Sequence, residues 1–292
     1  MTITGRTRIF GIIGDPIAHT RSPEMHNAAF DALGLDCRYI PFRVSPADLP
    51  DAVRGLRALG IAGFNVTIPH KEEIIPLLDE VTPDASLIGA VNTVVVDGNR
   101  LVGHNTDKTG FIQAIVRDLD FIPRGKRILI IGAGGGARSA IVGLAEEGAS
   151  SIAVTNRAPD RGERLIDSVK DRFIDVDMRT EPYDILGDDL RLSSYDLLVN
   201  ATPTGLRGER FDQFSPATPL TGYDMVYGDR PTPFVESIRR GGGRAATGEG
   251  MLAAQGEEAF FLWTGIRPPA NLMSLQLSTP PSDRTRPHEQ NW

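Results

Sequence analysis

The chain has 292 residues, of which 40% are hydrophobic and 24% charged, and its formal net charge is −7. This length exceeds what one hydrophobic core usually serves, so we expect a globular protein of two domains. The acidic balance, without any basic run interleaved with aromatic residues, argues against a nucleic acid or an acidic lipid surface as partner.

Cys37 is the only cysteine, which excludes an intramolecular disulfide and fits a reducing compartment. The N-terminus shows no basic segment followed by an apolar stretch, and no apolar run approaches the ~20 residues of a membrane helix. We therefore expect a cytoplasmic protein, either a monomer or a homodimer, with no membrane partner. Residues 278–292 are rich in Pro, Ser, Arg and Asp and predict a flexible tail.

Strand and helix patterns alternate from the start of the chain. Apolar runs predict strands at 8–13, 39–44 and 63–68, with helices at 22–33 and 46–59 between them. Ser22 is expected to be the N-cap of the first helix, with Pro23 at its first position. Pro69 is expected to begin a further helix, because its fixed φ suits a first turn.

A hairpin is predicted where two apolar runs flank Asp97-Gly-Asn99, and a helix at about 106–119 leads out of this region. A fresh alternation then predicts strands at 127–131, 151–155, 195–199 and 222–226, and helices at 136–147, 160–171 and 233–240. Helices that alternate with parallel strands are typical of a doubly wound sheet. We predict an α/β fold with a mixed, mostly parallel first domain at 1–108, completed by helices at about 249–277, and a second domain at 109–248.

A glycine turn follows the strand at 127–131, and it consists of Gly132, Ala133, Gly134, Gly135, Gly136 and Ala137. Gly132 permits a tight turn, Gly134 lets a pyrophosphate approach the backbone, and Ala137 lets helix and strand pack. The helix N-terminus that follows supplies free N–H groups for phosphates. Because a strand and a helix flank the turn, we predict a Rossmann dinucleotide site rather than a flexible loop.

The residues after the next strand indicate which dinucleotide binds. An NAD enzyme commonly places Asp or Glu there, on the ribose 2′-OH. This chain has Asn156 and Arg157, with Arg161 one helical turn further on. Two guanidinium groups without an acid favour a 2′-phosphate, so we predict NADP. The alternative interpretation is a pair of solvated surface arginines.

Two polar motifs precede the nucleotide domain, Asn65-Val-Thr-Ile-Pro-His-Lys71 and Asn105-Thr-Asp107. A positioned Lys–Asp pair beside a dinucleotide turn indicates hydride transfer with proton transfer to or from a hydroxyl or ketone. The alternatives are a surface lysine at 71 and a helix N-cap at Asp107. The histidines have no metal-ligand spacing, so no metal site is predicted.

Together the motifs resemble the shikimate dehydrogenase family of NADP-dependent oxidoreductases, from about Ile9 to about Pro268. Besides the segments above, the resemblance rests on Gly14-Asp-Pro-Ile-Ala-His-Thr-Arg-Ser22, Gly89-Ala-Val-Asn92, Asn200-Ala-Thr-Pro-Thr-Gly205, Asp224-Met-Val-Tyr227 and Gly250-Met-Leu-Ala-Ala-Gln255. It implies an enzyme of aromatic amino-acid biosynthesis that reversibly reduces 3-dehydroshikimate to shikimate with NADPH, in a cleft between two domains.

The resemblance also implies roles for individual residues. Lys71 is expected to give a proton to the alkoxide, with Asp107 holding the ammonium and binding the same hydroxyl. The substrate carboxylate is assigned to Thr20, Ser22 and Tyr227, and the ring hydroxyls to Thr67, Asn92 and Gln255. Further cofactor contacts are expected at Thr202, Gly250 and Met251.

Several positions depart from the family's usual pattern, and three of them bear on the site. Thr20 stands where a serine is usual, and His104 and Lys108 flank the Asn-Thr-Asp motif, although helical geometry is expected to turn Lys108 away from Asp107. The Thr20 change keeps open a quinate/shikimate dehydrogenase that uses NAD or NADP. A non-catalytic NADP-binding sensor of the same fold is the other alternative. Such a sensor could lose the Lys–Asp pair without penalty, so the presence of Lys71 and Asp107 argues against it.

Overall fold

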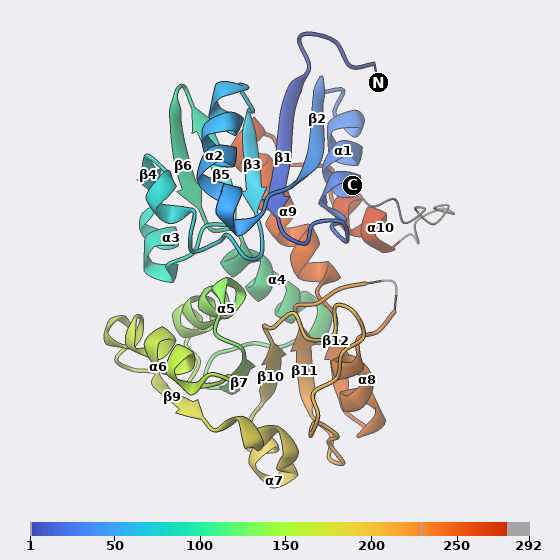
Figure 1. The fold of residues 1–292 in the computed structure, drawn as a ribbon. Helices are drawn as coiled ribbons and strands as arrows, with labels where there is room; N and C mark the ends of the chain where they lie inside the picture. Colours follow the sequence, from blue (N-terminus) through green and yellow to red (C-terminus); the bar gives the residue numbers. More distant parts are fainter. Residues whose placement is uncertain (1, 229, 279–292) are drawn as a thin grey trace.

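Two six-stranded sheets organise the structure, one in each of two α/β domains (Figure 1). The computed structural model describes residues 2–228 and 230–278. The predicted tail at 278–292 therefore lies outside the described residues, apart from Ser278 at its start. The predicted two-domain α/β fold with mostly parallel sheets is confirmed.

The sheet of the first domain is mixed and has the strand order β2-β1-β3-β5-β6-β4. Its strands are β1 (Arg8–Gly14), β2 (Cys37–Arg43), β3 (Gly63–Val66), β4 (Glu80–Val81), β5 (Thr93–Asp97) and β6 (Arg100–His104). Strand β5 runs antiparallel to β3 and β6, which confirms the predicted hairpin around Gly98. The helices are α1 (Ser22–Ala32), α2 (Leu49–Ala58) and α3 (Pro83–Ile88).

The sheet of the second domain is parallel throughout and has the order β12-β11-β10-β7-β8-β9. Its strands are β7 (Arg127–Ile131), β8 (Ser151–Thr155), β9 (Asp177–Glu181), β10 (Leu197–Asn200), β11 (Thr221–Asp224) and β12 (Arg244–Ala246). The helices are α5 (Gly135–Glu146), α6 (Pro159–Asp167), α7 (Asp189–Leu192) and α8 (Pro233–Arg240). Strand order reverses between β7 and β10, so the connections that follow these strands diverge and leave a crevice at their carboxyl ends.

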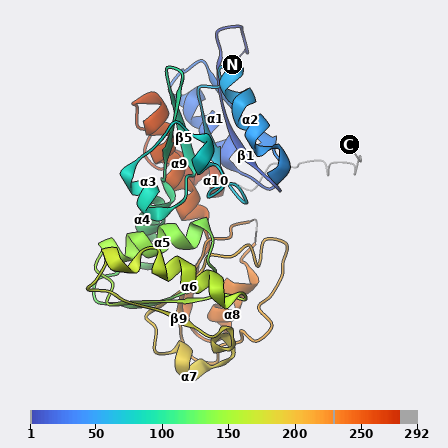
Figure 2. The same ribbon diagram turned by 60° about the vertical axis from the view of Figure 1, so that its left-hand side comes forward.

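Two long helices join the domains, α4 (Asp107–Leu119) and α9 (Glu249–Thr264), and they lie side by side at the junction (Figures 1 and 2). Trp263 at the end of α9 donates from Nε1 to the carbonyl of Val94 on β5, at 3.0 Å. The last helix, α10 (Leu272–Ser278), packs on α1. The chain thus returns to the first domain after the second is complete. The predicted domain boundaries stay a proposal, which this packing supports.

Apolar runs form the cores in the way that their positions in the sheets require. Residues 128–131 of β7 are all completely buried, because helices cover both faces of a parallel sheet. In the first domain a separate aromatic cluster joins α1, β1 and α9, with Phe30, Phe10 and Phe260 in contact. The helices and strands at the junction between the domains are therefore fixed by the packing of the two cores.

Two local predictions and one alternative interpretation are wrong. No α-helix follows Pro69; the segment forms turns and a short 3₁₀ helix, Ile75–Leu77, because Pro76 has no N–H to continue an α-helix. Arg21, not Ser22, is the N-cap of α1, and the Ser22 hydroxyl bonds to Tyr39 instead. Asp107 does not cap α4 either, because the Lys108 N–H donates to Asn105 Oδ1 at 3.1 Å.

Candidate active site

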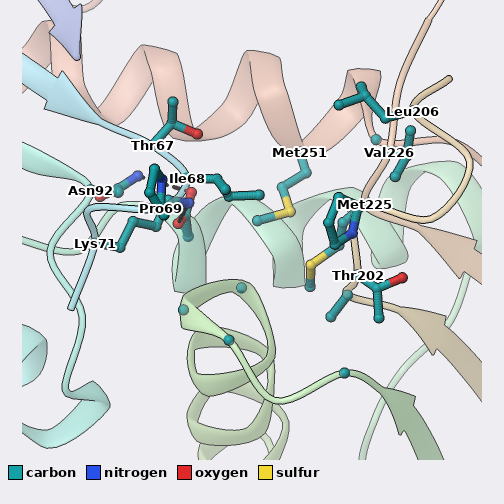
Figure 3. Close-up of a pocket in the computed structure, with 18 of the residues that line it drawn as sticks. Thr67, Ile68, Pro69, Lys71, Asn92, Thr202, Leu206, Met225, Val226 and Met251 are labelled. Atoms are coloured by element: carbon teal, nitrogen blue, oxygen red, sulfur yellow. Dashed lines mark hydrogen bonds and ion pairs between the residues drawn. The ribbon is translucent and has the colours of Figure 1, made fainter. Parts of the chain in front are cut away.

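One cavity of about 460 Å³ lies between the domains, bordered by the residues that follow β7 and β10. Figure 3 shows Thr67 and Lys71 of the first domain facing Thr202 and Met225 of the second, with Met251 of α9 between them. The crevice beyond the carboxyl ends of a doubly wound sheet is where such folds bind ligands.

Lys71 and Asp107 form an ion pair on the first domain's side of this cavity. Lys71 Nζ donates to Asp107 Oδ2 at 2.6 Å, although the residues are 36 positions apart. Their side chains are 17% and 6% exposed, so the pair is sheltered yet lines the cavity. Asp107 is the first residue of α4, where the helix N-terminus favours a negative charge. An ammonium held in this way can give a proton to an oxygen that becomes negative beside it.

The Lys71 side chain also lies against the glycine turn of the opposite domain. A Cβ on Gly135 would lie only 3.2 Å from both Cβ and Cδ of Lys71. Next to Lys71, Glu72 forms an ion pair with Arg138 of α5 at 3.2 Å, which crosses between the domains. The absence of a side chain at 135 therefore brings the Lys–Asp pair directly to the nucleotide turn.

Asn92 organises the polar wall behind Asp107. Its Nδ2 donates to Asp107 Oδ1 and to Thr106 Oγ1, each at 2.9 Å, and lies 3.4 Å from Gln255 Oε1. Its Oδ1 accepts from the Thr106 N–H at 2.7 Å. Asn92 is 2% exposed although it borders the cavity, so burial and these bonds together fix its geometry. The network of Asn92 therefore fixes the orientation of the Asp107 carboxylate beside Lys71.

A group of hydroxyls lines the same side of the cavity, from Thr20, Ser22, Thr67 and Tyr227. The Ser22 N–H donates to Thr20 Oγ1 at 3.3 Å. Burial raises the pKa of Tyr227, while a bond to the Thr20 side chain opposes the shift, so the phenol stays protonated. Neutral hydroxyl donors suit the binding of a carboxylate without a full counter-charge.

The glycine turn has the geometry that a bound phosphate requires. Gly132 has a φ of +115°, and a Cβ there would lie 3.0 Å from the carbonyl oxygen of Ala201. Gly134 is the N-cap of α5, and the space where its Cβ would stand is open to 4 Å. The free N–H groups of the first turn of α5 therefore face open space in the cavity wall, which fits a dinucleotide pyrophosphate.

Most of the predicted cofactor residues line this cavity, namely Gly132, Gly134, Gly135, Gly136, Asn156, Arg161, Thr202 and Met251. Ala137 does not; it is completely buried, in agreement with its predicted packing role. Arg157 is exposed outside the cavity, with its guanidinium 5.9 Å above the Tyr183 ring. Gly250 does not reach the cavity either, because it lies where α9 packs on α4 and a Cβ would collide with Asp118.

Some cavity residues were not assigned from the sequence. Asn65 on β3 lines it and accepts from the Tyr39 hydroxyl at 2.6 Å. Its signal was a polar residue inside an otherwise apolar strand. Leu206, Met225 and Val226 line the opposite side (Figure 3), and their pattern in the sequence does not differ from that of ordinary core residues.

The two departures beside Asp107 point away from it. Lys108 donates from Nζ to Asp84 and Glu146, at 2.5 and 2.8 Å, as helical geometry predicted. His104 lines a separate, smaller cavity on the other side of Thr106. Neither side chain enters the cavity that holds the ion pair.

Two features are absent from residues 2–228 and 230–278. None of the helices in this part of the chain combines the length and the apolar character that a membrane span needs. Within the same residues, no three His, Cys, Asp or Glu side chains are grouped so that they could hold a metal ion.

A dinucleotide-type glycine turn that faces a sheltered Lys–Asp pair across one cleft defines a two-domain oxidoreductase of the Rossmann class. Family models agree: "Shikimate dehydrogenase substrate binding domain" matches residues 12–94, "Shikimate / quinate 5-dehydrogenase" 118–204, and "Shikimate 5'-dehydrogenase C-terminal domain" 248–274. The chain belongs to the shikimate dehydrogenase family, which confirms the prediction made from its motifs.

Individual relatives match over nearly the whole chain. Shikimate dehydrogenase (NADP(+)) of Geobacter metallireducens is 50% identical over 94% of this chain and 96% of its own. A crystal structure of a shikimate dehydrogenase with NADP+ has a TM-score of 0.84 at 34% identity, covering 94% of this chain and 96% of its own. The Thermus thermophilus enzyme with NADP(H) and shikimate has a TM-score of 0.79 at 33% identity, covering 92% and 98%.

Proposed function

We propose that this protein reversibly reduces 3-dehydroshikimate to shikimate with NADPH. The observation that carries the proposal is the ion pair of Lys71 and Asp107, which lies against the glycine turn at Gly135 inside one cavity. The names of the relatives, and a relative bound to NADP(H) and shikimate, support the choice of substrate and cofactor.

The chain's own residues fit NADPH, which when bound supplies a hydride to the carbonyl carbon of the ketone. The first turn of α5 holds the pyrophosphate through backbone N–H groups at Gly134 and Gly135. Asn156 and Arg161 line the cavity next to this turn, so Arg161 binds the 2′-phosphate. Arg157 lies outside the cavity with its guanidinium over the Tyr183 ring, so its contribution to phosphate binding is the smaller of the two.

Lys71 supplies the proton that the reduction needs. As hydride reaches the carbonyl carbon, the C=O π electrons pass to oxygen, and an N–H bond of the Lys71 ammonium breaks to form the new O–H bond. One hydride and one proton are added, the ketone becomes the alcohol, and NADPH becomes NADP+. Asp107 orients the ammonium through its 2.6 Å hydrogen bond.

The remaining polar residues hold the substrate. Thr20, Ser22 and Tyr227 bind its carboxylate, since all three present hydroxyls to the cavity. The ring hydroxyls bind to Thr67, Asn92 and Gln255, whose amide and hydroxyl groups both donate and accept hydrogen bonds.

The test is a set of initial oxidation rates for shikimate and for quinate, each with NADP+ and with NAD+. Turnover largely confined to shikimate with NADP+ is the expected result. Comparable turnover of quinate, above all with NAD+, would move the protein to the broader quinate/shikimate activity and make Thr20 the first position to revert to serine. No turnover with any pair would favour the non-catalytic sensor.

Replacing Arg161 by alanine is expected to weaken NADP+ binding selectively. Loss of a charge-assisted bond to the 2′-phosphate costs roughly 1.5–3 kcal/mol, which is about ten- to a hundredfold in KM. Arg157→Ala is expected to act in the same direction but less, because its guanidinium rests on Tyr183 outside the cavity. KM for NAD+ should not change, since NAD+ has no 2′-phosphate.

Arg164→Ala is the matched control, because Arg164 lies on the same helix and pairs with Asp160 at 2.7 Å outside the cavity. An equal loss of affinity for NAD+ and NADP+ in Arg161→Ala would show that Arg161 does not read the 2′-phosphate.

A further inference from the structure

Asp224 at the end of β11 carries a carboxyl group that no step of the proposed reaction uses. The residue is completely buried. Burial, together with the charge of Glu249, raises the pKa of Asp224 to about 7, even though three hydrogen bonds oppose the shift. These bonds come from Asn200 Nδ2 at 2.8 Å, the Val226 N–H at 3.0 Å and the Thr232 hydroxyl. Burying a carboxyl group away from water costs free energy, and the proposed reaction gives this one no role.

The bond to Asn200 connects Asp224 to the loop after β10. Asn200 Nδ2 also donates to the Thr204 carbonyl at 3.0 Å, while its Oδ1 accepts from the N–H and hydroxyl of Thr202, at 3.0 and 2.7 Å. Every polar atom of the Asn200 side chain is therefore used to fold this loop. Thr202 lines the cavity at the tip of this arrangement (Figure 3).

The other two bonds connect Asp224 to the segment after β11. Val226 is bound directly, and the Met225 N–H donates to the Asn200 carbonyl at 2.9 Å. Thr232 bonds to Asp224 and at the same time caps α8, where it accepts from the Val235 N–H at 3.3 Å. Met225 and Val226 line the cavity next to Thr202 (Figure 3).

We propose that Asp224 is a positioning residue for the cofactor: its carboxyl group holds together the loop after β10 and the segment after β11, and so shapes the part of the cavity wall that Thr202, Met225 and Val226 form. A carboxylate has enough lone pairs to accept from all three donors at once, which no apolar residue of this size can do. The bonds are worth more in this buried site than at the surface. The proposal rests on the proposed function, since it assumes that the dinucleotide occupies this cavity.

The test measures Kd for NADP+ by calorimetry, and KM for NADP+ and for shikimate, in three variants. Asp224→Ala is expected to raise Kd and KM for NADP+ at least about tenfold and to change KM for shikimate less than about twofold. Asp224→Asn is expected to restore both cofactor values to within about threefold, because the amide oxygen still accepts from Asn200 and Val226, and its NH₂ can donate to the Thr232 hydroxyl.

Leu198→Ala is the matched control for stability. Leu198 is completely buried on β10, two residues before Asn200, and makes none of these bonds. It is expected to lower Tm at least as much as Asp224→Ala while leaving Kd for NADP+ within about threefold. An equal rise of Kd in Leu198→Ala, or an unchanged Kd in Asp224→Ala, would overturn the proposal.

Should Asp224→Ala fail to fold, Thr232→Val removes one of the three donors and keeps the shape of the side chain. A rise of Kd for NADP+ by about three- to tenfold supports the proposal, and an unchanged Kd contradicts it. Kd is measured without turnover. An inactive wild-type protein would therefore contradict the proposed activity, and the Kd values of the variants would still test the role of Asp224.

Discussion

Lys71→Ala is expected to lower kcat for shikimate oxidation by about 10²–10⁴-fold, the usual effect of losing a positioned general acid or base. In the oxidation direction the neutral amine of Lys71 takes the hydroxyl proton as hydride leaves, and alanine offers no acceptor at that place. Kd for NADP+ should stay within about threefold, because the pyrophosphate is held by the backbone of the glycine turn. Rapid-mixing kinetics with calorimetry separate the two effects.

Lys108→Ala is the control for Lys71→Ala. Lys108 follows Asp107 directly, is also partly buried, and is held by Asp84 and Glu146 outside the cavity. We expect its loss to leave kcat within about twofold, as for an ordinary ion pair away from the reacting atoms. Near-normal turnover in Lys71→Ala with cofactor binding intact would mean that another group moves the proton.

The parts of the site that the sequence predicted are those specified by local geometry. The glycine turn needs a positive φ at Gly132 and an open approach at Gly134, and few sequences other than a glycine run satisfy both. The strand before it and the helix after it follow from the apolar run at 128–131 and from the alanines of α5. These elements depend little on the rest of the chain, so pattern and propensity suffice to find them.

The parts that it did not predict depend on contacts between distant segments. Strands β4 and β12 have two and three residues and exist only because longer strands pair with them. The bond between Asn92 and Gln255 joins residues 163 positions apart, through a helix that returns from the second domain. That Arg161 enters the cavity and Arg157 does not depends on the Tyr183 ring, which lies 26 positions after Arg157.

His26 is expected to make the protein less stable in acid. It is completely buried in α1, its ring stacks on Tyr39 at 4.4 Å, and neither ring nitrogen has a hydrogen-bond partner within the described part of the chain. Burial lowers the pKa of His26 to about 3. In the unfolded chain the pKa is close to 6.5. Between these two values the unfolded state binds a proton that the folded state cannot, so the free energy of unfolding falls as the pH falls.

The loss amounts to about 1.4 kcal/mol for each pH unit below 6.5, or roughly 2 kcal/mol at pH 5 relative to pH 7. His26→Phe keeps a stacking ring but has no proton to bind, so its stability should exceed that of the wild type by this amount more at pH 5 than at pH 7. Urea unfolding followed by tryptophan fluorescence measures the difference, and one of the two tryptophans, Trp263, has its ring 5.3 Å from that of His26. Comparison at pH 8, where His26 is neutral in both states, isolates the effect of packing.

Asp224 contributes to the pH dependence with the opposite sign, because its raised pKa stabilises the fold as the pH falls below 7. Asp224 is present in both proteins, so its contribution cancels in the comparison. Parallel stability curves from pH 8 to pH 5 would show that His26 takes up its proton in the folded state through an opening of the cluster around Tyr39.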